Sequence, residues 1–257
     1  MTVQLATLCD RLDERLRTAD YADLDASANG LQIGDADREI EHAAFAVDGV
    51  RATIETAADG GADLLVTHHG IVWGGLDRVT GQAYDRIAPL IENDLALYVS
   101  HLPLDGHPEL GNAAGVADLL ELDDREPFGE VGPETIGQRG RASDPFTLEE
   151  LRDRLARELD TGDGRVRAFD FGPDEIEDVA IVTGSGADFL PEAREAGVDA
   201  LVTGEAKGKL YHEAREAGLN VVLGGHYATE TFGVRALQDL VGEWGLETTF
   251  IGHPTGL

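Results

Sequence analysis

The sequence predicts an α/β fold of two similar domains, with helices packed around mainly parallel sheets. Short apolar runs alternate with helical stretches along the chain, which is the pattern of strands joined by crossover helices. One strand-helix-strand unit occurs twice, which indicates an internal duplication. The chain has 257 residues, of which 42% are hydrophobic, and this is enough to build a core for each domain.

The first expected element is an amphipathic helix, in which apolar residues recur on one face at Val3, Leu5, Leu8, Leu12 and Leu16. Apolar runs then predict strands at residues 43–47, 64–67, 96–100, 166–169, 179–183, 200–203, 221–223 and 248–251. Helices are predicted at residues 84–92, 112–120, 148–159, 190–195, 211–216 and 231–244. A Thr-x-x-Glu capping box at Thr147 marks the start of the helix at 148.

The repeat is clearest in Gly61-Ala-Asp-Leu-Leu-Val-Thr67, which returns as Gly197-Val-Asp-Ala-Leu-Val-Thr203. The preceding strands are also alike, in Ala44-Phe-Ala-Val-Asp-Gly49 and Ala180-Ile-Val-Thr-Gly-Ser185. The following strands match in Leu95-Ala-Leu-Tyr-Val-Ser-His101 and Leu219-Asn-Val-Val-Leu-Gly-Gly-His226. A two-fold duplication is the simplest explanation, and it predicts two similar α/β halves.

A stretch rich in glycine, proline and acidic residues, 121–145, separates the two copies, and we interpret it as the crossing into a second domain. The first domain is expected to comprise approximately residues 1–130 and 224–257. The second domain is expected to comprise residues 131–223.

The chain is strongly acidic, with 50 acidic and 20 basic residues and a net charge of −30. At about 1 M ionic strength the Debye length falls to roughly 3 Å, and most of the resulting repulsion is screened. The acid excess, the few lysines and the sparse aromatic residues are typical of proteins from salt-loving organisms. The acids are spread along the chain, so an acidic interaction tail is the weaker interpretation. The charge also argues against a nucleic-acid partner, which needs a basic surface.

A single cysteine, Cys9, excludes an intrachain disulfide and a thiolate zinc site, and it fits a reducing, cytoplasmic compartment. The first residues lack a basic stretch followed by an apolar core, so we expect no signal peptide. No apolar run reaches the roughly 20 residues that span a bilayer, so we expect no membrane partner.

Two adjacent histidines, His68 and His69, follow the buried run at 64–66. Open α/β sheets bind ligands where the chain leaves the carboxyl ends of their strands. Adjacent side chains of an extended chain point in opposite directions, so two imidazoles can reach two points, which suits a pair of metal ions. In the second copy Gly204 and Glu205 replace the histidines, so the two copies differ in their chemistry.

Further potential ligands follow other strands: His101 precedes Asp105 by four residues, and His226 precedes Glu230 by four. This spacing is about one helical turn, so both members of a pair can face one point. Imidazole and carboxylate without thiolate suit zinc, manganese, iron, nickel or cobalt. Ordinary roles stay open on spacing alone, because Glu230 could complement a helix dipole and Asp105 could cap a turn.

Other features are less specific. The segment Thr183-Gly-Ser-Gly-Ala187 could cradle a phosphate, although a tight strand-to-helix turn is the simpler interpretation. Lys207 and Lys209 are the only lysines, and they could contact an anion or belong to an ordinary loop. Three histidines without a matching carboxylate are expected at the surface or near interfaces: His42, His212 and His253. A Gly-x-Ser-x-Gly elbow is missing from the sequence, which argues against acyl-enzyme chemistry.

Five motifs together resemble the Nif-three-like family, also known as GTP cyclohydrolase I type 2 homologues or dinuclear metal centre proteins. In family order they are Asn29-Gly-Leu-Gln-Ile-Gly34, Thr67-His-His-Gly70, His101-Leu-Pro-Leu-Asp-Gly-His-Pro-Glu-Leu-Gly-Asn112, Thr203-Gly-Glu205 and Gly225-His-Tyr-Ala-Thr-Glu230. The resemblance extends from the first motif almost to the last residue. The chain looks like the short form, without an inserted domain.

The resemblance implies an intertwined two-domain fold, a cage-like homohexamer built as a trimer of dimers, and a site for two divalent metal ions per chain. The ligands that it implies are His68, His69, Asp105, His226 and Glu230. The resemblance implies that the Glu, alone or with the Asp, touches or bridges both ions. Two further residues are candidates for a catalytic or auxiliary role, His101 and Glu205.

The activity that the resemblance implies is metal-dependent hydrolysis, in which water adds to the purine C8 of GTP and formate leaves. Two metals can activate water and polarise the ring. A hydrolase of another nucleotide or of a phosphoester would use the same ligands. A non-catalytic metal-handling or adaptor protein is the alternative from another class, and nucleic-acid binding is the third, which the charge disfavours.

Overall fold

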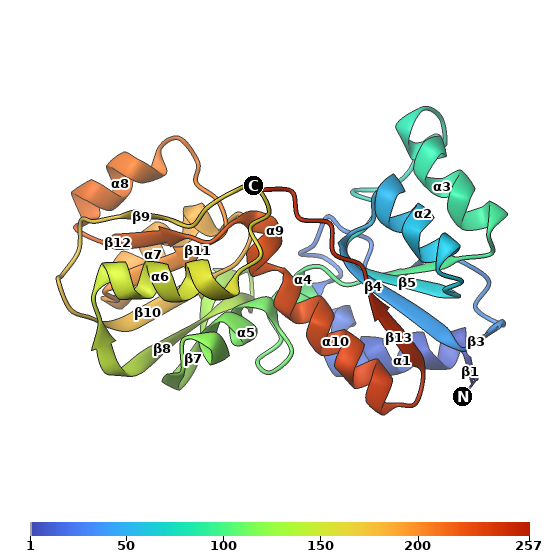
Figure 1. The fold of residues 1–257 in the computed structure, drawn as a ribbon, viewed down its shortest axis with the longest axis horizontal. Coiled ribbons are helices and arrows are strands. Elements are labelled where there is room, and N and C mark those ends of the chain that lie inside the picture. Colours follow the sequence, from blue (N-terminus) through green and yellow to red (C-terminus); the bar gives the residue numbers. More distant parts are fainter. Residues whose placement is uncertain (1) are drawn as a thin grey trace. The chain divides into compact units, whose positions relative to one another are not determined.

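A computed structural model describes residues 2–257, which fold into two compact units (Figure 1). The first unit holds the chain up to Leu104 together with Gly233–His253. The second unit holds Asp105–Phe232 and Pro254–Leu257. Neither unit is one continuous segment, because the chain returns to each of them.

The first unit is built on a five-stranded sheet. Its strands are β2 (Gly30–Ile33), β4 (His42–Asp48), β5 (Leu64–His69), β6 (Ala96–Val99) and β13 (Glu247–Phe250). They lie in the order β13-β4-β5-β6-β2, with β2 antiparallel and the other four parallel. The helices of this unit are α1 (Leu5–Leu16), η1 (Thr18–Tyr21), α2 (Arg51–Asp59), α3 (Gln82–Glu92) and α10 (Thr231–Glu243), the last of which begins two residues before Gly233. Two short strands, β1 (Val3–Gln4) and β3 (Glu39–Ile40), pair separately.

Helices cover both faces of this sheet, and alternate strand residues supply a core to each face. The strand residues that pack with α2 and α3 are Ala44, Ala46, Leu65, Leu97 and Val99. Figure 1 shows α1 and α10 on the opposite face. The buried apolar residues of α1 include Leu5, Leu8, Leu12 and Leu16, as their spacing predicts, whereas Val3 lies in β1. Burial on both faces explains why these strands are continuous apolar runs in the sequence.

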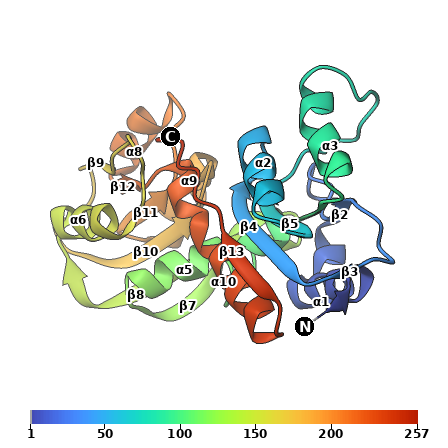
Figure 2. The ribbon, with the colours of Figure 1, turned by 45° about the vertical axis from the view of Figure 1, so that its right-hand side comes forward.

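The second unit is built on a six-stranded sheet. Its strands are β7 (Leu122–Val131), β8 (Glu134–Phe146), β9 (Arg167–Phe169), β10 (Ile176–Val182), β11 (Ala200–Thr203) and β12 (Asn220–Leu223), in the order β7-β8-β10-β11-β12-β9. Only β10, β11 and β12 are parallel to one another. Its helices are α5 (Asn112–Leu119), α6 (Leu148–Glu158), η2 (Gly186–Phe189), α7 (Leu190–Ala196), α8 (Leu210–Ala217) and α9 (His226–Thr229). Residues of α5 and α6 pack in one core of this sheet and residues of α7 and α8 in another, so helices cover both of its faces (Figure 2).

The two sheets share a topology. Each has three consecutive parallel strands, β4-β5-β6 in one and β10-β11-β12 in the other. In each, an antiparallel strand from earlier in the chain, β2 or β9, pairs with the third of them. A helix precedes that strand in both units, α1 in the first and α6 in the second. This is the arrangement that a duplication predicts, and the duplication itself stays a prediction.

The predicted strands and helices coincide with observed elements, but the interpretation of residues 121–145 as a crossing between domains is wrong. These residues form most of the β7–β8 hairpin of the second sheet. The middle of β7 is exposed, so no buried apolar run marks it in the sequence. Gly132, with φ of 61°, lies in the turn between the two strands.

The second unit contains the whole of the predicted second domain, 131–223, and extends beyond it at both ends. At its start, α5 packs in the same core as β8, β10 and α6. At its end, Ala228 of α9 packs into that core as well. Segments 105–130 and 224–232, which the prediction assigned to the first domain, therefore fold with the second unit.

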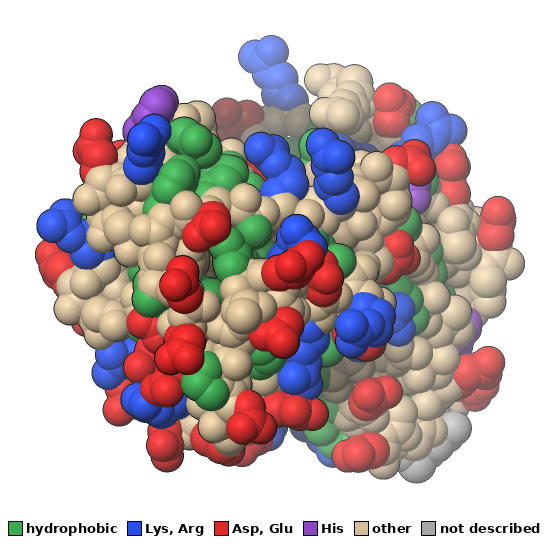
Figure 3. All heavy atoms as spheres, turned by 60° about the vertical axis from the view of Figure 1, so that its left-hand side comes forward, with side chains coloured by type: hydrophobic (Ala, Val, Ile, Leu, Met, Phe, Trp, Pro, Cys, Tyr) green, Lys and Arg blue, Asp and Glu red, His purple; other side chains and the backbone are tan. Residues whose placement is uncertain are grey.

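The surface carries the charge that the composition predicts. Figure 3 shows acidic side chains scattered over the visible face, interleaved with arginines and lysines rather than gathered in one block. Among residues 2–257, none of the helices combines the length and the apolar character needed to cross a membrane.

Candidate metal centre

Three histidines meet at the carboxyl edge of the first sheet. His68 and His69 end β5, and His101 follows the neighbouring parallel strand β6. One ring nitrogen from each histidine lies within 4.8 Å of those of the other two. The ring centroids are 4.6 Å apart for His68 and His69, and 5.0 Å apart for His68 and His101. We call these three residues the histidine group.

Oxygen atoms fix the orientation of the first two rings. Nδ1 of His68 lies 3.0 Å from the carbonyl oxygen of Ser100, to which it can only donate. Nδ1 of His69 lies 2.8 Å from Oδ1 of Asp48, the last residue of β4. Each contact places the proton on Nδ1 and the lone pair on Nε2, the form in which neutral imidazole binds metals.

Asp25 fixes the third ring. Its Oδ1 lies 2.9 Å from Nδ1 of His101, and the Asp25 side chain is only 2% exposed. The same carboxylate accepts bonds from the backbone N–H groups of Ser27 and Leu102 and from Nδ2 of Asn29. Burial alone would raise the pKa of Asp25, but the contact with His101 and the other donors outweigh it and lower the pKa to about 2. Asp25 is therefore a charged anchor for His101.

The segment that contains Asp25, residues 25–32, also binds the backbone on both sides of the histidine group. Oδ1 of Asn29 accepts from the backbone N–H of His101 at 2.8 Å. Oε1 of Gln32 accepts from the N–H groups of Ile71 and Val72, which follow the histidine pair, at 3.0 and 3.2 Å. Residues 25–32 therefore fasten the ends of both β5 and β6.

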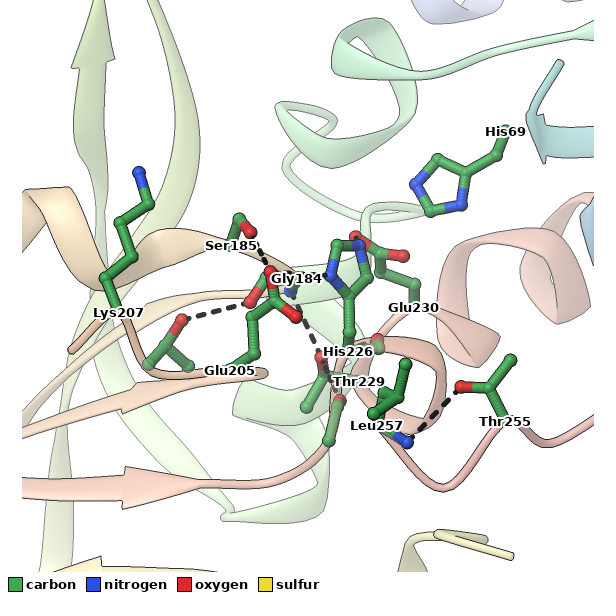
Figure 4. Close-up of polar contacts among 12 residues, drawn as sticks. His69, Gly184, Ser185, Glu205, Lys207, His226, Thr229, Glu230, Thr255 and Leu257 are labelled. Atoms are coloured by element: carbon green, nitrogen blue, oxygen red, sulfur yellow. Dashed lines mark hydrogen bonds and ion pairs between the residues drawn. The ribbon is translucent and has the colours of Figure 1, made fainter. Parts of the chain in front are cut away.

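A second set of polar residues gathers in the second unit around His226, the first residue of α9. Its Nε2 lies 3.2 Å from Oε1 of Glu230, and its Nδ1 lies 3.4 Å from Oε1 of Glu205, which follows β11. Figure 4 shows the two carboxylates on either side of the imidazole. Burial would lower the pKa of His226, but Glu230 and then Glu205 outweigh it and raise it to about 9. We call His226, Glu230 and Glu205 the carboxylate group.

The turn after β10 is shaped to fit this group. Gly184 has φ of 58°, and a Cβ built on it would lie 2.1 Å from Oε1 of Glu230, so the site requires glycine there. Ser185 donates a hydrogen bond to Glu205. The carbonyl of Gly184 accepts from the N–H of Glu205 at 2.9 Å. The segment 183–187 is thus a tight turn that supports the two carboxylates, rather than an open phosphate cradle.

Asp105 ends α4 (Leu102–Asp105), which begins directly after His101. Its side chain is buried, and its Oδ1 accepts from Nδ2 of Asn112 at 2.8 Å and lies 3.5 Å from Oγ1 of Thr183. Asn112 and Thr183 belong to the second unit, as Asp105 does.

The ligands implied by the resemblance therefore divide between the units. His68 and His69 belong to the first, whereas Asp105, His226 and Glu230 belong to the second. His101 joins the first set and Glu205 the second. Sequence reasoning missed the carboxylates behind the histidines, Asp48 and Asp25. Asp48 is predictable in the same way as the histidines, because it lies at the carboxyl end of a buried strand. Asp25 does not lie at the end of a strand, so the sequence does not mark it.

The remaining polar candidates have ordinary partners. Lys207 and Lys209 both pair with Asp188, and Lys209 also lies 3.6 Å from Glu213. His212 and His253 are exposed, and His42 is partly exposed with its Nε2 2.8 Å from Oγ1 of Thr249.

Comparison with known proteins identifies the family. A model of the Duf34/NIF3 (NGG1p interacting factor 3) family matches residues 3–255. The chain belongs to the Duf34/NIF3 family. A protein of Halobacterium salinarum named GTP cyclohydrolase 1 type 2 homolog is 60% identical to it, over 99% of this chain and all of that one. A homolog of the same name from Pyrococcus abyssi is 43% identical over 96% of each chain.

Solved structures agree with this assignment. The crystal structure of a protein from Thermus thermophilus is 36% identical and has a TM-score of 0.89, covering 99% of this chain and all of that one. A protein described as of unknown function has the same TM-score and 33% identity, with the same coverage. The α/β fold is therefore that of the Duf34/NIF3 family, and the resemblance seen in the five motifs is confirmed.

Proposed function

We propose that this Duf34/NIF3 protein binds two divalent metal ions and uses them to hydrolyse a nucleotide. The observation that carries the proposal is the histidine group, in which an oxygen partner orients every ring through Nδ1. Orientation of this kind is what metal-ligating histidines need, because it fixes the tautomer and aims Nε2. Three neighbouring histidines that served only to pack the end of the sheet would not each require it.

The proposed ligand set is the one that the family resemblance implies, with one histidine added. His68 and His69, with His101 added, come from the histidine group, and the remaining ligands are Asp105, His226 and Glu230. Glu205 is proposed to hold Nδ1 of His226 rather than to bind metal.

The donor set fits hard or borderline divalent ions such as zinc, manganese, iron, nickel or cobalt. When bound, such ions supply a Lewis acid and activate water for attack. The protein's own residues fix the imidazoles and keep the Glu230 carboxylate buried. The substrate class follows from the relatives, which are named for GTP cyclohydrolase 1 type 2.

Metal content tests the ligand set. Elemental analysis of purified protein is expected to find two metals per chain in the wild type, and much less in Glu230→Gln and His69→Ala. His212→Ala, which removes an exposed histidine of the second unit, serves as the matched control and should retain the metal. Two metals per chain in both site variants would refute the assignment.

Turnover tests the reaction. Metal-loaded protein is incubated with GTP in high salt, and formate is measured. Formate release that Glu230→Gln abolishes is the expected result. Turnover of phosphoesters but not of GTP would replace the cyclohydrolase with another metal-dependent hydrolase. Tight metal binding without turnover of any substrate would favour a metal-handling or adaptor role.

We also propose that the chain assembles as the homohexamer that its family resemblance implies. Several large apolar side chains of the first unit are exposed between β5 and the end of α3: Leu76, Val79, Tyr84 and Ile91. Burial of these side chains between subunits would remove apolar surface from water. Light scattering after size-exclusion chromatography in high salt should give six times the chain mass, and a monomer would refute the proposal.

A further inference from the structure

Trp73 lies beside the histidine group and is held in place although it is exposed. Its side chain is 43% exposed, yet its Nε1 donates a hydrogen bond to the carbonyl oxygen of Gly70 at 3.1 Å. Its backbone forms an antiparallel bridge with Ser27. The N–H of Ala28 donates to the carbonyl of Val72 at 3.1 Å. The indole is therefore fixed by the same segment that orients the histidines.

The indole also contacts the group directly. Its ring centroid is 4.9 Å from that of His101, with the two planes at 76°, and 6.2 Å from that of His69. The second tryptophan of the chain has a different setting, because the Arg11 guanidinium lies 3.8 Å over the Trp244 ring. Trp73 is thus an ordered, exposed aromatic surface at the edge of the candidate metal centre.

We propose that Trp73 stacks against the planar heteroaromatic ring of the substrate and places that ring, rather than a phosphate, at the histidine group. This inference rests on the proposed function and specifies how the substrate binds. Stacked rings lie about 3.5–4 Å apart, so a base on the indole has its edge close to His101 and His69. Every nucleobase has a π-face, and stacking on tryptophan needs no positive charge.

The indole of Trp73 favours a base over a phosphate. Its π-face can stack on a nucleobase and carries no positive charge for an anion. The exposed segment that follows Trp73 does not gather positive charge either, because Arg78 stands next to Asp77 there.

Two ligands separate the base from the phosphates: GTP, and inorganic tripolyphosphate, which lacks the base. Their binding to metal-loaded protein is measured by calorimetry for the wild type, Trp73→Leu and Trp244→Phe. Trp73→Leu keeps an apolar side chain but removes the π-face, and Trp244→Phe is the control at the covered tryptophan. GTP binding to Trp73→Leu is expected to weaken roughly 5- to 150-fold. Tripolyphosphate binding to Trp73→Leu, and GTP binding to Trp244→Phe, should stay unchanged.

Other outcomes overturn the inference. Equal affinity of wild type and Trp73→Leu for GTP would show that the indole does not stack on the base. An equal loss of affinity for GTP and for tripolyphosphate in Trp73→Leu would show a general effect on the site. Absence of GTP binding to the wild type would show that the site accepts no base. Failure of the proposed function is distinguishable, because it would appear as GTP bound through Trp73 without release of formate.

Discussion

At the scale of single residues, the candidate centre depends on the oxygen atom that accepts a hydrogen bond from each imidazole. Nδ1 of each histidine donates a hydrogen bond to an oxygen of Ser100, Asp48 or Asp25. The Nε2 atom of each histidine therefore carries the lone pair. The carbonyl of Ser100 belongs to the backbone and cannot be removed by a side-chain substitution. The two carboxylates can be exchanged for amides, which makes them the residues where orientation and charge can be tested.

Replacing Asp25 with asparagine should weaken metal binding without unfolding the protein. An amide is nearly the same size and still accepts hydrogen bonds, but it is a weaker acceptor for His101. Loss of such a partner typically lowers metal affinity about 10- to 100-fold. The measurement is competition for zinc against a chromophoric chelator, with the visible spectrum of the cobalt form as a second readout of ligand geometry.

Asp13→Asn is the matched control for that substitution. Asp13 lies in the same unit and accepts a hydrogen bond from the buried hydroxyl of Tyr98 at 2.7 Å. Its replacement should lower stability but leave zinc affinity and the cobalt spectrum unchanged. Equal losses of affinity in both variants would mean that Asp25 acts through the fold and not through His101.

Gly184→Ala should displace Glu230, whereas Gly197→Ala should not. Both glycines have positive φ, 58° and 71°, so alanine at either position costs about 1–2 kcal/mol of stability. Only at Gly184 does the new Cβ meet a ligand, 2.1 Å from Oε1 of Glu230, while nothing lies within 4 Å of a Cβ at Gly197. Urea unfolding should therefore show a loss of stability in both variants, and elemental analysis should show loss of metal in Gly184→Ala alone. Full metal content in both variants would contradict the proposed role of Glu230.

The residues that reach the site were predictable only where they follow strands or belong to a motif. His68, His69, His101 and Glu205 all come directly after or at the end of buried apolar runs. Asp25 lies in an irregular segment 76 residues before His101, and nothing in its local sequence indicates this partner. Contacts formed by tertiary folding between distant segments leave no periodic signal in one sequence.

At the scale of elements, the start of α6 offers a local test of the capping signal that the sequence contained. Oγ1 of Thr147 accepts from the N–H of Glu150 at 3.2 Å, and Oε2 of Glu150 accepts from the N–H of Thr147 at 2.8 Å. Thr147→Ala should lower the free energy of unfolding by about 1 kcal/mol. The double variant with Glu150→Ala should lose less than the sum of the two single losses, because both belong to one box.

The capping box also predicts a dependence on pH. The backbone and hydroxyl of Thr147 lower the pKa of Glu150 below its usual 4.5. A carboxylate with a lowered pKa stabilises the fold above pH 4.5, and this contribution is lost as the pH falls through the folded-state value. The difference in stability between wild type and Thr147→Ala should therefore shrink in acid. A constant difference across this range would show that Glu150 does not take part.

Strands that are buried on both faces of a sheet were predictable from the sequence, whereas exposed or charged strands and short helices were not. The strands around the histidine group are apolar throughout, so their positions followed from the sequence. The β7–β8 hairpin is mostly exposed along β7 and carries ion pairs such as Arg139 with Glu126. Helix α2 is short, and only Thr53, Ile54 and Ala57 are buried in it. Such elements hold their place by pairing and packing that the local pattern does not reveal.

At the scale of the whole molecule, the excess of 50 acidic over 20 basic residues should make stability depend on salt. Exposed ion pairs, such as Arg141 with Glu177, are weakened by salt, but each contributes only about 0–1 kcal/mol. The repulsion among the remaining acids acts between many pairs at longer range and is screened first, because the Debye length falls from about 10 Å at 0.1 M salt to about 3 Å at 1 M.

The melting temperature should therefore rise between about 0.1 M and 1 M sodium chloride and then level off as the Debye length falls below the spacing of surface charges. Differential scanning calorimetry of the metal-loaded protein measures this rise. Sucrose at the same osmolality is the control, since it is excluded from the surface but screens no charge. An equal rise in sucrose would assign the effect to exclusion, and a fall in salt would mean that the ion pairs outweigh the repulsion. A rise in salt alone would show that repulsion among the acidic side chains lowers the stability of the fold at low salt.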